Sequence, residues 1–164
     1  MRTLVAFIVG LIAAPILFAA AGIAGLLPSN STSEPPKWES SIGMRALDAS
    51  LEKRSKGLKN AVAANDPLAL AAGMKIYGQN CAGCHGDAKG PSAWGVKGLY
   101  PRAPQFLQYG SDVTPPEAYA AIRDGIRYSG MGAWNGQLKD DEMWKVANYV
   151  ASLRGKNGSM KDMD

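Results

Sequence analysis

Both cysteines of this 164-residue chain and its only histidine fall within five consecutive positions, in the segment "NCAGCHGD". Cys81 and Cys84 are separated by two residues, and His85 follows directly. Two thiols and one imidazole this close in sequence must contribute to a single local site. The spacing therefore limits which folds and which chemistry are open to the chain.

Four kinds of site use this spacing: a redox dithiol, half of a zinc site, a disulfide, and covalent haem attachment. A thioredoxin-like dithiol needs a strand and helix context, and structural zinc needs four Cys or His ligands where this chain has three. A disulfide closing so short a loop would restrain little of the unfolded chain. Haem attachment uses all three residues, because Cys81 and Cys84 join the porphyrin and His85 faces the iron. We predict one covalent haem c.

The N-terminal part carries a long apolar segment. Residues 4–27 contain no charged side chain, and about 20 apolar residues are enough to cross a bilayer as a helix. Cleavage as a signal peptide stays as an alternative, although such peptides have apolar stretches of roughly 7 to 15 residues. With Arg2 on the inner side, the sequence predicts a single-pass protein of the bacterial inner membrane with its haem domain in the periplasm.

Composition predicts one folded domain and argues against a nucleic-acid partner. Hydrophobic residues make up 46% of the chain and charged residues 20%, which is typical of a globular domain. The formal net charge of +4 is low for a dedicated nucleic-acid binder. We therefore expect no nucleic-acid partner.

Helix signals recur along the chain and no useful strand pattern occurs, so the predicted fold class is all-α. Asp66 followed by proline is typical of a helix start, and capping-box spacing at Thr114 begins another helix. The last helix is predicted between Asp140 and Arg154, and residues 86–105 as irregular loop. The expected organisation is a membrane anchor (1–27), a linker (28–38), a helical lead-in (39–65), the haem domain (66–155) and a flexible tail (156–164).

The second axial ligand of the iron must be methionine, lysine or water, because no second histidine exists. Met131 is the one methionine in a loop after the motif, and Gly130 and Gly132 on either side allow a close approach to the haem. An ordinary core methionine is the alternative. Histidine with methionine raises the reduction potential, which is typical of electron carriers.

Three segments, "AGMKIYGQNCAGCHG", "GLYPRAP" and "IRYSGMGAWNGQLKDDEMWKVANYVASL", resemble the class I cytochrome c family, in particular bacterial single-haem domains with an N-terminal membrane anchor. The resemblance implies a few helices around one covalent haem. It also implies that the helix before the motif crosses the last helix at Gly73, with Tyr77 facing Tyr149.

The same resemblance implies a proline whose carbonyl accepts the N–H of His85. Pro104 is the match, with Pro91 and Pro101 as alternatives. Many relatives carry proline directly after the methionine ligand, where this chain has Gly132, and glycine should loosen the loop.

Other aromatic and basic residues near these segments are candidates for the haem pocket or for hydrogen bonds to the haem propionates. They are Tyr100, Arg102, Arg127 and Trp134. Ordinary packing or solvent exposure accounts equally well for each.

The sequence predicts a membrane-anchored electron carrier that moves one electron at a time between respiratory or dehydrogenase partners. We expect no enzymatic activity and no small-molecule substrate, with redox proteins and the membrane as partners. A fixed haem subunit of a larger membrane complex is the first alternative. A haem sensor or peroxidase is the second, but it would need distal acid–base groups.

Overall fold

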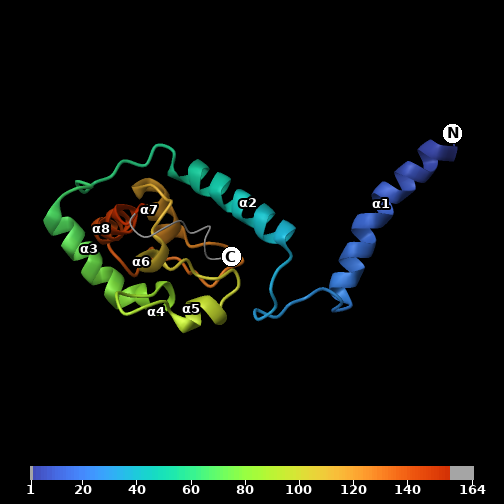
Figure 1. The fold of residues 1–164 in the computed structure, drawn as a ribbon. Coiled ribbons are helices and arrows are strands. Elements are labelled where there is room, and N and C mark those ends of the chain that lie inside the picture. Colours follow the sequence, from blue (N-terminus) through green and yellow to red (C-terminus); the bar gives the residue numbers. More distant parts are fainter. Residues whose placement is uncertain (1, 156–164) are drawn as a thin grey trace. The chain divides into compact units, whose positions relative to one another are not determined.

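The computed structural model describes residues 2–155, and the predicted tail, 156–164, lies outside them. The chain divides into two units, Met1–Ser33 and Glu34–Asp164. Within the described residues the regular elements are eight helices, which agrees with the predicted all-α class (Figure 1). They are α1 (Arg2–Ile23), α2 (Lys37–Ser55), α3 (Pro67–Asn80), α4 (Ala82–His85), α5 (Ala93–Lys97), α6 (Phe106–Tyr109), α7 (Pro115–Asp124) and α8 (Asp140–Ser152).

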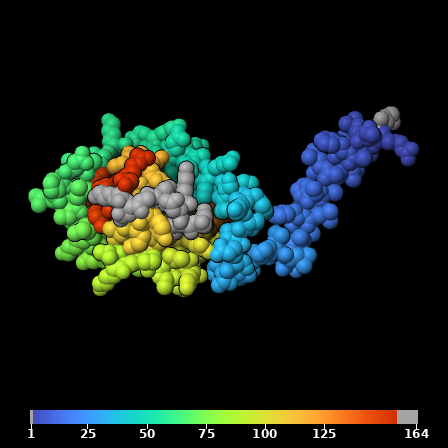
Figure 2. Space-filling view, viewed as in Figure 1, coloured from blue at the N-terminus to red at the C-terminus, as the bar shows by residue number. Residues whose placement is uncertain are grey.

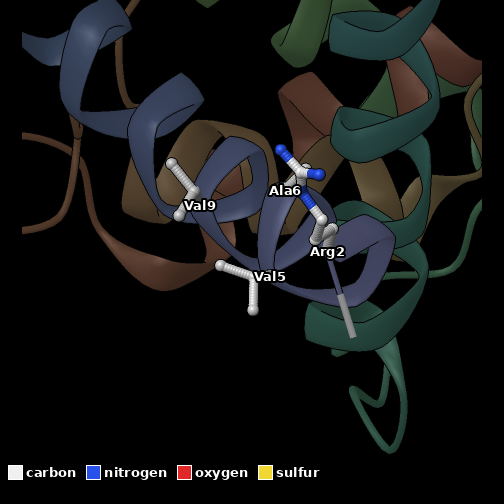
Figure 3. Close-up of a pocket in the computed structure, with 4 residues that line it drawn as sticks. All are labelled: Arg2, Val5, Ala6 and Val9. Carbon is white, nitrogen blue, oxygen red and sulfur yellow. The ribbon is translucent and has the colours of Figure 1, made fainter.

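The first unit contains α1, which is long and apolar enough to cross a membrane. Pro15 lies inside this helix, as membrane-spanning helices tolerate. A small pocket on its surface is lined by Arg2, Val5, Ala6 and Val9 (Figure 3). These positions follow the i, i+3, i+4, i+7 spacing of one helix face, and the pocket includes none of the candidate site residues.

The second unit is organised by the crossing of α3 and α8 (Figure 1). A Cβ atom built on Gly73 would lie 2.1 Å from the carbonyl oxygen of Lys145, so only glycine allows this approach. Tyr77 and Tyr149 meet edge to face, with ring centroids 5.4 Å apart. The predicted helix crossing is therefore confirmed.

Helix α7 also packs against α8, and α3, α7 and α8 share one hydrophobic core; Figure 2 shows the outer atoms of the chain in the same view. The rings of Tyr119 and Trp144 stack with centroids 4.0 Å apart. The hydroxyl of Tyr119 also donates to the carboxylate of Asp140. The capping box predicted at Thr114 is present, with Glu117 accepting from its backbone N–H at 2.8 Å.

The lead-in helix α2 begins at Lys37, inside the segment predicted as linker, and ends at Ser55. Pro35 and Pro36 come directly before it, and a residue that precedes proline is disfavoured in a helix, so the helix starts once the prolines are passed. Leu51 is its buried residue. Farther on, Asn60 donates to Asn148 of α8 at 2.7 Å, which fixes the end of the lead-in to the core.

The segment predicted as irregular loop is more ordered than expected. It contains α5, and the side chain of Ser92 caps that helix by accepting from the N–H of Gly95 at 3.0 Å. Helix α6 follows immediately after the segment. The segment 86–105 contains four glycines and three prolines, and the five residues of α5 are too few to show a periodic pattern. This short helix could therefore not be predicted from the sequence.

Candidate functional site

The attachment motif lies where α3 ends and α4 begins. The N–H of Cys81 donates to the carbonyl of Tyr77 at 2.8 Å, and the N–H of His85 donates to the carbonyl of Cys81 at 2.9 Å. Both cysteine thiols are free and half-buried. The pKa of Cys81 is raised to about 11, mainly by burial and to a smaller extent by the neighbouring Cys84. One turn of helix thus presents two thiols and an imidazole.

The imidazole of His85 is oriented by a backbone carbonyl, since its Nδ1 lies 2.9 Å from the oxygen of Pro104. A carbonyl can only accept, so Nδ1 carries the proton and Nε2 keeps a free lone pair. Burial lowers the pKa of His85, and the hydrogen bond to Pro104 partly opposes that effect. A neutral imidazole with an oriented Nε2 is the form that binds metal. This contact is the one that the resemblance implies for Pro104.

Four consecutive motif carbonyls accept hydrogen bonds from side chains elsewhere in the domain. Such carbonyls at the end of a short helix would otherwise lack partners. The hydroxyl of Tyr77 lies 3.0 Å from two of them and shares its one proton between them. The hydroxyl of Ser92 donates to the third at 2.6 Å, and the amide of Gln105 donates to the fourth at 2.9 Å. The carbonyls belong to Gly83, Cys84, His85 and Gly86.

Gln105 is the functional neighbour that the sequence did not reveal. It is fully buried, and besides Cys84 its amide nitrogen donates to Ala103 at 2.7 Å. Its Oε1 accepts from the N–H of Ser92 at 2.7 Å. A glutamine in a loop is usually exposed, and only its three backbone partners explain its burial. Beside it, a Cβ on Gly95 would lie 1.8 Å from the carbonyl oxygen of Cys84.

Replacement of Gln105 by alanine is expected to lower the free energy of unfolding by about 2 kcal/mol, because one buried and two partly buried backbone groups lose their partner. The measurement is denaturant unfolding of the haem-containing protein. Gln137→Ala is the matched control, since Gln137 is exposed and its side chain makes one hydrogen bond, of 3.2 Å, to the carbonyl of Ala133. Equal stability of the two variants would contradict the bracing role of Gln105.

Met131 lies in a loop closed by its own backbone. The N–H of Ile126 donates to the carbonyl of Met131 at 3.0 Å. The hydroxyl of Ser129 donates to the carbonyl of Ile126 at 2.8 Å and accepts from the N–H of Met131 at 3.1 Å. Gly132 is exposed, and a Cβ there would meet nothing within 4 Å, so the glycine after Met131 leaves that side of the loop unpacked.

The motif and the Met131 loop both place apolar side chains against the same hydrophobic core. Partly buried side chains from both regions pack against it, as do those of α6 between them. They include Cys81, Ala82, Phe106, Leu107, Met131, Trp134 and Leu138. Two free thiols, one oriented imidazole and one thioether amid apolar side chains are a donor set that fits a covalent haem.

The remaining predicted site residues occupy varied positions. Trp134 is half-buried against the core, and Arg127 is exposed. The hydroxyl of Tyr100 donates to Glu39, which raises the pKa of Tyr100. Arg102 pairs with Glu34. Tyr100 and Arg102 thus have carboxylate partners in the segment that leads into the haem domain.

The helical fold and the attachment motif together define a c-type cytochrome domain with covalently bound haem c. Residues 68–150 match the family described as cytochrome c oxidase, cbb3-type, subunit III, and the chain belongs to this family. The match and α1 together support anchoring in a membrane.

Individual relatives agree with this placement. The chain is 39% identical over 98 residues to the cbb3-type cytochrome c oxidase subunit CcoP of Azospirillum sp. (strain B510), covering 56% of this chain and 31% of that subunit. It is 40% identical over 87 residues to subunit FixP of Bradyrhizobium sp. (strain ORS 278), covering 52% and 28%. The chain therefore spans about a third of the length of these relatives.

Among solved structures, cytochrome cL of Methylophaga aminisulfidivorans aligns with 63% of this chain and 73% of its own. The identity is 23% and the TM-score is 0.39.

Proposed function

We propose that this protein is a membrane-anchored single-haem cytochrome that carries one electron at a time between redox proteins, without being an enzyme itself. The observation that carries the proposal is the 2.9 Å contact between Nδ1 of His85 and the carbonyl oxygen of Pro104, because it leaves Nε2 of a partly buried, neutral imidazole for the iron. A haem bound here supplies a one-electron couple between ferric and ferrous iron.

Each residue of the site has a distinct role in this proposal. Cys81 and Cys84 hold the porphyrin covalently. His85 and Met131 would bind the iron, Pro104 would strengthen His85 as a donor, and the thioether of Met131 would raise the reduction potential. Trp134 packs in the haem pocket. Tyr100 and Arg127 are proposed as further pocket or propionate contacts.

The proposed location is the bacterial inner membrane, crossed once by α1, with the haem domain on the periplasmic side. The apolar, uncharged segment after Arg2 supports this orientation. The domain boundaries are proposed as anchor 1–27, linker 28–38, lead-in 39–65, haem domain 66–155 and tail 156–164.

A fixed haem subunit of a larger respiratory assembly is the second candidate. The relatives are named as subunits of a cbb3-type cytochrome c oxidase, which favours an electron-accepting oxidase as the partner class. Mild detergent extraction followed by mass determination separates the two candidates. A monomer indicates a free tethered carrier, and stable association with other subunits indicates a component of a complex.

Electron carriage itself is tested by potentiometric titration of the purified, detergent-solubilised protein. The expected result is a single transition that fits one electron per haem and is fully reversible. Rapid binding of carbon monoxide to the reduced protein at neutral pH would instead indicate an open iron position, and it would replace this proposal with a sensor or peroxidase.

A further inference from the structure

The lead-in helix α2 contacts α7, and α7 ends at Asp124, just before the loop that carries Met131. The Arg54 guanidinium donates from one terminal nitrogen to the carbonyl oxygen of Gly125 at 3.1 Å. It also lies 3.6 Å from the carboxylate of Asp124. Leu51, one turn earlier, is buried, so the helix is held against the domain beside this arginine.

Gly125 is tightly packed against the backbone that runs from the carbonyl of Met131 to Ala133. Its φ is +70°, and an added Cβ would lie 2.8 Å from the nitrogen of Ala133 and 2.9 Å from both the carbonyl carbon of Gly132 and the carbonyl oxygen of Met131. The next residue, Ile126, donates to that same Met131 oxygen at 3.0 Å. A displacement of Gly125 must therefore displace the backbone of Met131.

The contact of Arg54 with the end of α7 is more than an ordinary surface ion pair with Asp124. The side chains of Arg54 and Asp124 are 28% and 34% exposed, and pairs of that kind contribute little. Asp124 is already bound by Arg123 at 2.7 and 2.8 Å. The bond to Gly125 differs, because carbonyls at the end of α7 lack helical partners and a cation is favoured at a helix C-terminus.

We propose that Arg54 is a positioning residue for the axial ligand, holding the Gly125 carbonyl so that the loop keeps Met131 on the iron. The inference rests on the proposed ligation by Met131. Helix α2 lies before residues 68–150, which match the family. The proposed control of the Met131 loop therefore comes from the lead-in helix and not from the part of the chain that the family match covers. Helix α2 thus determines how easily another ligand replaces Met131 on the iron.

The test is a spectroscopic titration of the ferric protein with imidazole. Imidazole binds only when Met131 has left the iron, so its apparent affinity is proportional to the population of that open state. Losing one charge-assisted hydrogen bond changes such an equilibrium by on the order of tenfold. Arg54→Leu is therefore expected to bind imidazole about tenfold more tightly. Arg45→Leu, a change at an exposed arginine of the same helix, should match the wild type.

Two further variants separate positioning from general destabilisation. In a Met131→Ala background, Arg54→Leu should have no additional effect on imidazole affinity, whereas a nonspecific loss of packing would still change it. Arg54→Lys keeps the charge and the aliphatic stem, so it provides a folded variant if Arg54→Leu does not fold. Its affinity should lie between those of the wild type and Met131→Ala.

The outcomes distinguish this inference from the proposed ligand set. If Met131→Ala tightens imidazole binding but neither Arg54 variant does, Arg54 is not a positioning residue and Met131 stays the ligand. If the wild type already binds imidazole as tightly as Met131→Ala, the ligand assignment is wrong and the role of Arg54 is overturned with it.

Discussion

Replacement of Met131 by alanine is expected to abolish the weak far-red absorption band that methionine sulfur produces on ferric haem. The covalent attachment through Cys81 and Cys84 should persist, because it does not involve Met131. The reduction potential should fall, since loss of the thioether removes the ligand that favours ferrous iron. Optical spectra of the oxidised protein and a potentiometric titration measure both effects.

Met74→Ala is the matched control for this result. Met74 lies on α3 and is 54% exposed, whereas Met131 is partly buried against the hydrophobic core. Met74→Ala should leave the band and the potential unchanged. A wild-type protein without the band would show that the second axial position is open or filled by another ligand.

Replacement of Gly73 by alanine is expected to cost roughly 4 kcal/mol of unfolding free energy, at the upper end of overpacking effects. The new methyl group would lie 2.1 Å from the carbonyl oxygen of Lys145 and 2.7 Å from its carbonyl carbon. Backbone atoms of two crossing helices cannot move aside without separating the helices. Denaturant unfolding of the haem-containing protein gives the value.

Gly78→Ala on the same helix is the control for the Gly73 result. A Cβ at Gly78 meets nothing within 4 Å, so this change should stabilise α3 by about 0.5–1 kcal/mol through its helix propensity. If both alanine variants were equally stable, the crossing of α3 and α8 would not depend on close backbone contact.

The sequence predicted the local features because their signals are local. The spacing of Cys81, Cys84 and His85 led to the haem, and the capping patterns at Asp66 and Thr114 located two helix starts, which the structure confirms. The crossing at Gly73 followed from family resemblance, since a glycine alone does not reveal which backbone approaches it.

Contacts between distant segments could not be predicted in the same way. Gln105 reaches Cys84 across 21 positions, and Arg54 reaches Gly125 across 71. No sequence pattern predicts these contacts of Gln105 and Arg54, because the partner in each is a backbone carbonyl that any amino acid would provide. The carboxylates bound by Tyr100 and Arg102 were missed for a related reason, since Glu34 lies in the predicted linker and Glu39 at the start of the predicted lead-in, both far from the haem domain in sequence.

Helix α3 both builds the core of the domain and leads into the attachment motif. Its middle forms the crossing with α8 at Gly73, and its end leads directly into Cys81. Folding free energy and iron ligation are therefore thermodynamically linked, as binding and folding are whenever a site exists only in the native state. With the ligand set proposed for His85 and Met131, which favours ferrous iron, we expect the reduced protein to be harder to unfold than the oxidised protein, because the complete ligand set exists only in the folded domain.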